Sequence, residues 1–548
     1  MSLSTGVTRL RSHPWPALLL LLVLLVYARS LLGDFVVDDV PVVRDNPYVQ
    51  QSGHITDYFS RGLWANTALE DNSVPMYRPL FHVYHALSFS LWGTHPLGYH
   101  AMLLLLHLAN TCLVYLLVRR LAPTTSLAAT FGAAVFALNP ARVESVAWIS
   151  GITDPLTTLF LLLALFAHRA QSDGHLWPYA AALVSFQCAL WNKEVALIFP
   201  LVIVAHDLIY QRRVRWSVTA LYAALAAAYL LMRSAVLGTA GDWSALAWPQ
   251  ASRLVDFMLG YGELLSLPTD IPFYLSPPRQ PVASAFAIFG VLALLAMLAY
   301  AWRAGNGAHR KSVLFALAWA SAFSWSALLM AFYREGYFSA RFLYLPSVGV
   351  AILAAACYDQ LSASHASRRK IVAAAGVLLI ASYSAISWKE IGAWQDDGSI
   401  YAKIIRDAPE DVAGHVGLGR YYYDRGDYAQ AEPAFLAALD KQGSPQNRAA
   451  ALAALGTMRG MAGDIAQSRV YLEQAVRLDP ASSEAWTGLG NLAWMEGHPL
   501  DAIPAYEKAV VASPRNYEAA MNLVSAYEKT GQGWRAAPIR QRWFTQQH

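Results

Sequence analysis

Charged residues are scarce in this sequence. Only 14% of its 548 residues are Asp, Glu, Lys or Arg, whereas 56% are hydrophobic, and an ordinary soluble domain has roughly 25% charged residues. This composition excludes a wholly soluble protein and predicts a membrane protein. The net charge is only +4, and the basic residues occur in short clusters between apolar runs. Nucleic acid is therefore not an expected partner.

Cysteine is scarcer still. The three cysteines, Cys112, Cys188 and Cys357, all lie inside apolar runs, and none belongs to a CxxC or Cys/His ligand pattern. The sequence therefore predicts neither a disulfide framework nor a zinc site, and the three side chains are expected to be small buried residues.

Long apolar runs, by contrast, are abundant. We expect eleven membrane spans, so the lipid bilayer is the first expected partner. With eleven spans the basic clusters between them fall on one side, which the positive-inside rule assigns to the cytoplasm together with the N-terminus. The spans are expected near residues 15–33, 98–118, 125–139, 151–167, 177–191, 194–210, 216–237, 284–302, 312–331, 341–358 and 370–388.

Two segments could change this count. The first run follows Arg9 and Arg11 and could also be a secretory signal peptide, but Arg29 interrupts the small-residue pattern of a cleavage site. The segment Ser252–Leu267 contains two acids and two glycines. We expect it to be an interfacial helix on the outer side of the membrane.

The chain after the last span has a soluble composition and an internal repeat of about 34 residues. Each copy has an apolar pair that is followed, seven residues after its second member, by a glycine: Gly426, Gly463, Gly497 and Gly531. These features predict four tetratricopeptide repeats, an architecture that usually offers a groove to a peptide or another protein. We therefore expect an all-α chain with a polytopic membrane domain at 1–390, a linker at 391–410 and a soluble α-solenoid at 411–548.

Ionisable residues lie at the ends of several spans on the expected outer face. Asp38 and Asp39 follow the first span, where a carboxylate is expensive unless a partner or substrate compensates it. The other candidates are Arg78, Arg142, Glu144, Asp154, Lys193, Arg341 and Tyr344. Each also has a structural interpretation: the aspartates could form a solvated turn, Arg142 could pair with Glu144, Lys193 with Glu194, and Arg341 could anchor the interface.

This set of residues suits glycosyl transfer from a lipid-phosphate sugar. An aspartate can take the proton of an acceptor hydroxyl that attacks the anomeric carbon, and such a direct displacement inverts that centre. The departing phosphate needs cationic stabilisation, which Arg142, Lys193 or Arg341 could provide. No cofactor is expected, although paired carboxylates could also bind a divalent cation.

Six motifs stand out along the chain. They are D-F-V-V-D-D (34–39), Y-R-P-L (77–80), H-P-L-G-Y-H (95–100) with His107, N-P-A-R-V-E-S-V-A-W-I-S-G-I-T-D (139–154), N-K-E (192–194) and R-F-L-Y-L-P-S-V-G (341–349). In this order they resemble the transmembrane and tetratricopeptide repeat-containing O-mannosyltransferases, which are GT-C glycosyltransferases. The resemblance implies a polyprenyl-phosphate-sugar donor, an extracytoplasmic site and no required metal. It makes Asp38 the expected base, with Asp39 as the fallback, and puts Arg341 near the donor phosphate.

Two positions depart from that family. Asn139 and Asn192 stand where its animal members have His and Cys, which leaves the sugar, expected to be mannose, and the acceptor, expected to be a protein Ser or Thr, open. A bias of Arg over Lys and alanine-rich spans indicate a bacterium. The protein would then lie in the inner membrane, with the site and the repeats in the periplasm. The donor carrier would be undecaprenyl phosphate. The competing interpretations are a non-enzymatic scaffold for envelope proteins and a transporter. The near absence of charge within the spans argues against a transporter.

Overall fold

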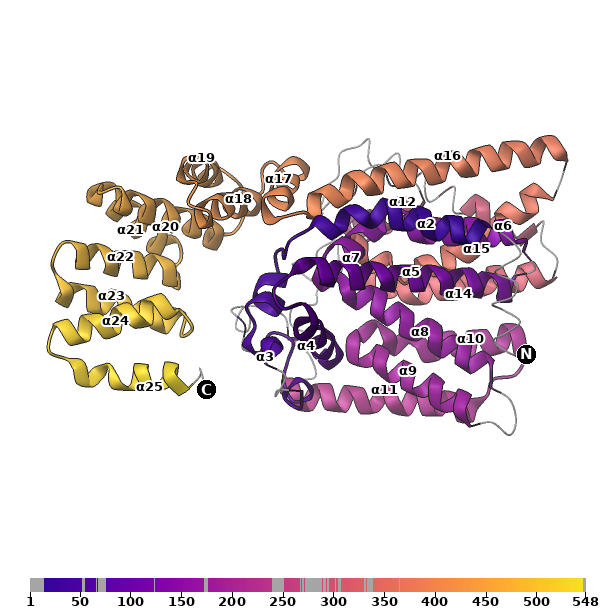
Figure 1. The fold of residues 1–548 in the computed structure, drawn as a ribbon, viewed down its shortest axis with the longest axis horizontal. Coiled ribbons are helices and arrows are strands. Elements are labelled where there is room, and N and C mark those ends of the chain that lie inside the picture. The colour runs from indigo at the N-terminus through magenta and orange to yellow at the C-terminus, as the bar shows by residue number, and fades with distance from the viewer. Residues whose placement is uncertain are drawn as a thin grey trace. The chain divides into compact units, whose positions relative to one another are not determined.

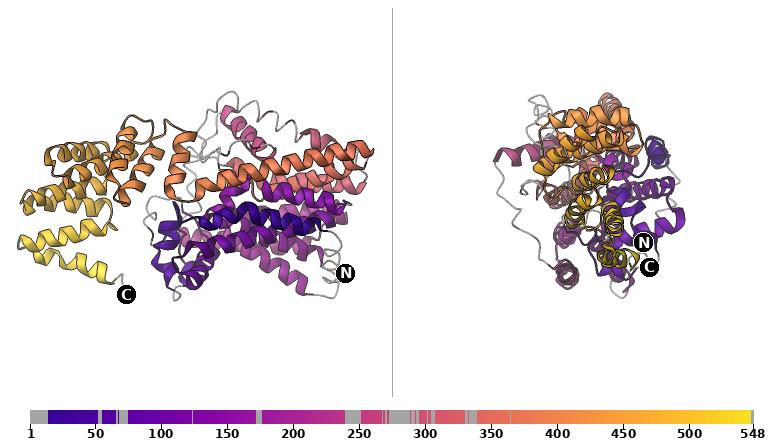
Figure 2. Two further views of the ribbon diagram at one scale, coloured as in Figure 1. Left: turned by 45° about the horizontal axis from the view of Figure 1, so that its top comes forward. Right: turned by 90° about the vertical axis from the view of Figure 1, so that its left-hand side faces the viewer.

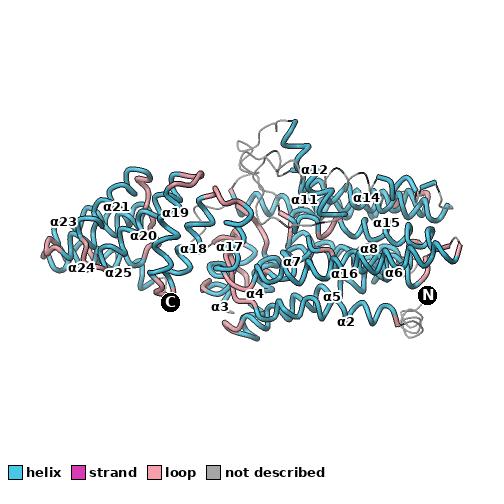
Figure 3. Tube along the Cα trace, turned by 90° about the horizontal axis from the view of Figure 1, so that it is seen from above, coloured by secondary structure: helices cyan, strands magenta, loops and turns pink. Residues whose placement is uncertain are grey.

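The chain folds into two compact units, Met1–Asp396 and Asp397–His548. The computed structural model describes residues 14–51, 55–65, 67, 75–122, 124–171, 176–238, 251–266, 268, 271, 288, 292, 295–300, 302–303, 307–329, 332, 339–363 and 365–545. Within these ranges all regular secondary structure is helical, and the only β-type pairing is an isolated bridge between Asp411 and Gln442 (Figure 3). The expected all-α class is confirmed.

The first unit is a bundle of helices whose long members run side by side (Figure 1). Its longer helices are α2 (Trp15–Tyr27), α4 (Pro79–Trp92), α5 (Pro96–Leu121), α6 (Ser126–Leu138), α8 (Thr153–Arg169), α9 (Trp177–Asn192), α10 (Phe199–His206), α11 (Trp216–Leu237), α12 (Ala251–Ser266), α14 (Gly307–Leu329), α15 (Ser347–Ser362) and α16 (Ala366–Ile391). Short helices connect them: η1 (Ala28–Leu32), η2 (Val40–Arg44), α3 (Pro47–Gln50), η4 (Asp57–Phe59), η5 (Pro140–Arg142), α7 (Val143–Ala147), η6 (Ile149–Ile152), η7 (Glu194–Ile198), η8 (Asp207–Gln211), η11 (Ala340–Leu343) and η12 (Gly392–Trp394).

Six helical stretches of the described chain are long and apolar enough to cross a membrane. They are Trp15–Leu32, Pro96–Leu121, Ile149–Arg169, Glu194–Gln211, Trp216–Leu237 and Ala366–Trp394, and Ser126–Leu138 and Ser347–Ser362 are shorter apolar helices. These findings confirm a polytopic membrane helix bundle. The count of eleven stays a prediction, because the run near 284–302 lies mostly outside the described residues.

Small residues let the central helices approach closely. A Cβ atom on Gly132 of α6 would lie 2.4 Å from the Ala351 carbonyl oxygen of α15, and one on Gly349 of α15 would lie 2.4 Å from the Ala316 carbonyl oxygen of α14. Helices in a bilayer have no hydrophobic drive toward one another, so such close backbone packing is a main source of their association. Larger residues at these glycines would force the three helices apart.

The bundle has two chemically different ends. At one end the basic clusters lie near one another: Arg120 covers the ring of Phe166, Arg169 contacts His206, and Ser312 donates to the Leu121 carbonyl. At the other end the first and second outer loops share a hydrophobic core that includes Phe35, Val43, Leu63, Phe81, Tyr99, Ile149 and Ile152. The candidate site residues all lie at this second end.

The repeat unit is a stack of antiparallel helix pairs (Figure 2). After α17 (Asp397–Asp407), the pairs are α18 (Val412–Asp424) with α19 (Tyr428–Leu439), α20 (Pro445–Met461) with α21 (Ile465–Leu478), α22 (Ser483–Met495) with α23 (Pro499–Ala512), and α24 (Tyr517–Lys529) with α25 (Ala537–Thr545). The four predicted turn glycines all have positive φ, between 74° at Gly426 and 84° at Gly463. The expected α-solenoid of tetratricopeptide repeats is confirmed.

The segment expected to be a linker is helical. Residues 391–410 contain the end of α16, η12 and α17, and α17 packs on α18, where Gly398 and Gly414 give Tyr421 and Ile404 room. The second compact unit therefore begins at Asp397, earlier than the predicted position 411. The reason is packing, since α17 covers an apolar face that the first repeat would otherwise expose.

Candidate active site

Asp38 and Asp39 lie in a tight turn that follows a strained residue. Val37 has a φ of 51°, a conformation that a β-branched residue rarely adopts. The Asp39 carboxylate holds this turn, because its oxygens accept the Val36 N–H at 3.1 Å and the Ser150 N–H at 2.7 Å. Backbone strain of this kind persists only where the surroundings enforce it, and it is concentrated at functional sites.

The two aspartates have different environments. Asp39 is fully buried, and burial raises its pKa to about 7 although the hydrogen bonds to Ser150 and Val36 oppose the shift. Asp38 is partly exposed, and burial also raises its pKa, against the opposing effect of the nearby Arg341 guanidinium. Of the two, only Asp38 has a partly exposed side chain, and it lies within electrostatic reach of a cation 303 positions later in the chain.

Arg341 is fixed by the second outer loop. Its backbone N–H donates to Glu144 at 3.1 Å, and its guanidinium lies 3.7 Å from the other oxygen of that carboxylate. The Ser339 hydroxyl donates to Glu144 as well. The guanidinium also lies 4.7 Å from the centre of the Trp148 ring, a cation–π contact. Glu144 and Trp148 thus orient the charge that faces Asp38.

Two further ion pairs surround this centre. The Lys193 ammonium donates to both oxygens of Asp154, at 2.6 and 2.7 Å, and both side chains are nearly buried. Arg78 pairs with Glu194 at 3.0 Å. Burial lowers the pKa of Lys193; Asp154 opposes that shift, while Arg78 and Arg341 lower it further. Three cations therefore lie within electrostatic reach of one another.

Arg142 is the unusual member of the set. Its side chain is 0% exposed, and none of its three guanidinium nitrogens has a hydrogen-bond partner among the residues that the structure describes. Burial lowers its pKa to about 10, while Tyr27, Tyr344, Tyr383 and Asp154 oppose the shift. An unpaired buried cation is costly, so its field favours a negative charge nearby. Because its side chain is enclosed, the Arg142 guanidinium is not open to direct contact with a ligand in this structure.

Tyr344 is held beneath the site. The backbone carbonyl of Ala137 lies 3.1 Å from His107 Nε2, which therefore bears the proton, so Nδ1 accepts from the Tyr344 hydroxyl at 2.7 Å. Asn110 donates to the same hydroxyl at 3.3 Å. The hydroxyl is fully used in this network and orients the segment that presents Arg341.

The structure brings all nine predicted site residues to the same end of the bundle. The two ion pairs between sequence neighbours do not form: Glu144 pairs with Arg341, Lys193 with Asp154, and Glu194 with Arg78. The sequence interpretation missed the roles of Trp148 and of Ser150. Both lie inside the quoted 139–154 motif, but only the fold shows what they contact.

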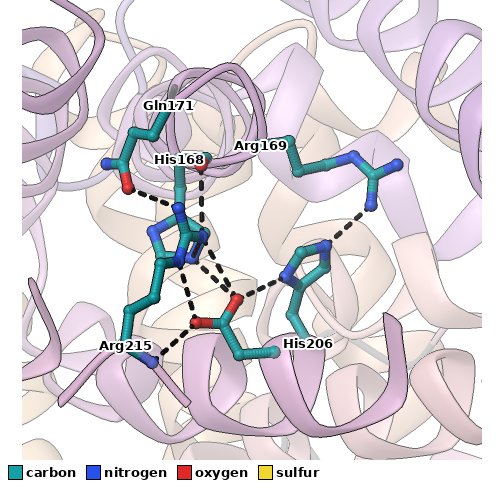
Figure 4. Close-up of polar contacts among 6 residues, drawn as sticks. His168, Arg169, Gln171, His206 and Arg215 are labelled. Atoms are coloured by element: carbon teal, nitrogen blue, oxygen red, sulfur yellow. Dashed lines mark hydrogen bonds and ion pairs between the residues drawn. The ribbon is translucent and has the colours of Figure 1, made fainter. Parts of the chain in front are cut away.

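A second polar cluster lies at the opposite end (Figure 4). Among the described residues, His168, His206 and Asp207 form the one group with ligand atoms close enough for a metal ion, within 4.8 Å of one another. Arg215, however, binds both oxygens of Asp207 at 3.2 Å and contacts His168. Its guanidinium compensates the buried carboxylate and would repel a metal cation. The cluster joins α8, α10 and the segment before α11.

Fold and site together define a membrane helix bundle with a buried, charge-lined centre, joined to a repeat solenoid. The family model "Tetratricopeptide repeat" matches residues 399–458, 461–516 and 491–539. Over 430 residues the chain is 26% identical to a protein O-mannosyl-transferase of Caenorhabditis elegans, covering 76% of this chain and 61% of the worm protein. It is 31% identical over 197 residues to the human protein O-mannosyl-transferase TMTC1, covering 34% of this chain and 22% of that protein.

These matches confirm the expected resemblance to O-mannosyltransferases with tetratricopeptide repeats. The chain spans less than two thirds of the length of these curated relatives. A crystal structure of ArnT from Cupriavidus metallidurans bound to undecaprenyl phosphate aligns with 88% of this chain and 81% of that chain, at 12% identity and a TM-score of 0.39. A likeness at that level does not define a shared fold.

Proposed function

We propose that this protein is an inverting GT-C glycosyltransferase that moves a sugar, mannose in the first instance, from a polyprenyl-phosphate donor to a Ser or Thr hydroxyl of a protein. The observation that supports this most directly is the strained turn at Val37 that carries the partly exposed Asp38, together with an Arg341 guanidinium held by Glu144 and Trp148. The similarity to protein O-mannosyl-transferases points to the same reaction class.

In the proposed reaction Asp38 takes the proton of the acceptor hydroxyl while that oxygen forms its bond to the anomeric carbon. The bond between this carbon and the donor phosphate oxygen breaks, and the polyprenyl phosphate leaves with one additional negative charge. Arg341 contacts the phosphate, with Lys193 beside it, and the buried Arg142 adds a favourable field. This assignment needs no metal for charge balance at the leaving group.

The site would face the extracytoplasmic side, because the basic clusters gather at the opposite end of the bundle, where the positive-inside rule places the cytoplasm. The inner membrane of a bacterium, with the repeats in the periplasm, is the proposed location. The solenoid would present the protein acceptor, since stacked helix pairs of this type form extended binding surfaces.

The test uses the full chain in proteoliposomes with radiolabelled polyprenyl-phosphate mannose and a Ser/Thr-rich peptide. Asp38→Asn should lower transfer by about 10²- to 10⁴-fold, the usual contribution of a general base. Asp45→Asn is the matched control, because Asp45 is an exposed acid of the same loop, and it should retain wild-type transfer. Unaltered transfer in both Asp38→Asn and Asp39→Asn would remove the base assignment, and absence of transfer by the wild type would favour the scaffold interpretation.

A further inference from the structure

Trp394 lies at the end of the first unit, three residues before the repeat unit begins. Its ring stacks on that of Trp148, with 5.8 Å between centroids and 28° between planes, and both side chains are buried. The Arg341 guanidinium contacts Trp148 in turn. Two aromatic rings thus connect the end of the first unit to the cation that faces Asp38.

A second contact joins the same turn to the other half of the site. The backbone carbonyl of Gln395 accepts the Asp34 N–H at 2.9 Å, and the Gln395 side chain donates to the Arg29 carbonyl at 3.2 Å. Asp34 begins the short stretch that leads through the strained Val37 to Asp38. Residues 394 and 395 therefore contact the supports of both Asp38 and Arg341.

The support matters because the ion pair of Arg341 is loose. Its guanidinium lies 3.7 Å from Glu144, which is longer than a hydrogen bond, so the contact with the Trp148 ring adds to its orientation. A ring that stacks behind Trp148 limits how far that ring can tilt. A displacement of about 1 Å at a substrate-positioning group can cost about 100-fold in rate.

We propose that Trp394 is a positioning residue of the active site, which acts on the donor phosphate through Trp148 and Arg341. This inference rests on the proposed function and adds to it a role for the segment that leads into the repeats. Trp394 itself contacts no substrate. Its removal should weaken the interaction with the donor phosphate and leave the acceptor interaction unchanged.

The experiment compares Trp394→Ala, Trp394→Phe and the control Trp216→Ala in the proteoliposome assay, with KM measured separately for donor and acceptor. Trp216 is 67% exposed and lies at the other end of the bundle. We expect Trp394→Ala to raise the donor KM by about tenfold at unchanged acceptor KM, Trp394→Phe to restore most of the donor affinity, and Trp216→Ala to match the wild type. Far-ultraviolet circular dichroism should lose the exciton couplet of the stacked indoles in both Trp394 variants.

The outcomes separate the two proposals. If the wild type transfers sugar and Asp38→Asn does not, but Trp394→Ala keeps the wild-type donor KM, the positioning role is overturned and the function stands. A lower kcat with both KM values unchanged also overturns it, because that pattern reports a smaller folded fraction. If the wild type shows no transfer, the proposed function fails, and the positioning role fails with it.

Discussion

The two units of this chain pair their charges in different ways. In the repeat unit, Arg459 with Glu432, Arg469 with Glu496 and Arg535 with Glu507 join residues 27 or 28 positions apart, and these side chains are about a third or more exposed. In the membrane unit, Lys193 with Asp154, Arg78 with Glu194 and Arg341 with Glu144 join residues 39, 116 and 197 positions apart and are mostly buried.

The difference distinguishes charges that pair because the sequence repeats from charges that pair because the fold brings distant loops together. Exposed pairs between neighbouring repeats recur because the repeat recurs, and each contributes little to stability. Buried pairs between distant loops exist only if the whole bundle is assembled, and the loss of one partner is expensive. The membrane unit also contains Arg142, a buried charge with no hydrogen-bonded partner in the described part of the chain. Because the three ion pairs are each neutral, Arg142 is the positive charge of the site that stands against the carboxyl groups of Asp38 and Asp39.

The largest effect is expected at the buried pair. Lys193→Met leaves the Asp154 carboxylate buried and unpaired, so it should lower the free energy of unfolding by about 3–5 kcal/mol. The double variant Lys193→Met/Asp154→Leu should recover most of that loss, because it removes both charges. Thermal unfolding in detergent measures both. A single variant as stable as the wild type would show that this pair is no more important than a surface pair.

The next effect concerns pH. Asp38 must be ionised to accept a proton, and burial raises its pKa. When the pH is lowered, kcat/KM should therefore begin to fall at a higher pH than it would for an ordinary carboxyl group, whose pKa is about 3.9. The Arg341 cation lowers that pKa. Arg341→Gln should therefore lower kcat/KM about 100-fold and move the acid limb of the profile to higher pH. The control Arg44→Gln removes an exposed cation from the loop of Asp38 and should leave the acid limb of the pH profile unchanged. An unchanged acid limb in Arg341→Gln would show that Arg341 does not influence the pKa of Asp38.

A smaller effect is expected in a repeat turn. Gly497 has a φ of 82°, and a Cβ atom added there would contact no neighbouring atom. Gly497→Ala therefore isolates the conformational cost of a left-handed backbone, which should lower the free energy of unfolding by about 1 kcal/mol. Gly533 also has open space around it but no positive φ, and Gly533→Ala should therefore cost nothing. Chemical denaturation monitored by tryptophan fluorescence compares the two. Equal stabilities would mean that the turn glycines are not conformationally required.

The smallest effect is expected at an exposed pair. Arg420 and Glu484 are 3.0 Å apart, with side chains 59% and 58% exposed, so Arg420→Ala should change the free energy of unfolding by at most about 0.5 kcal/mol. The same unfolding measurement tests this. A loss of several kcal/mol would contradict the contrast between the two units.

Much of the architecture could be predicted because it depends on local pattern. Apolar runs of membrane length predicted the helices, and the turn glycines predicted the solenoid, since a positive φ at the end of each first helix demands glycine. The helix α17 was missed because its short amphipathic sequence lies outside the repeat pattern, and its apolar face is recognisable only once α18 packs on it. Nothing in the sequence of η12 indicated that Trp394 would stack on Trp148.

The sequence by itself determined the class of the protein, the position of its repeats and the residue types of the proposed site, because hydropathy and periodicity are local properties. The tertiary structure alone decided which charges pair, which of the two aspartates is partly exposed and which arginine lies within its electrostatic reach. These depend on interactions between loops far apart in the chain, such as that of Asp38 with Arg341 over 303 positions, where burial and distance, not sequence spacing, set the electrostatic energy.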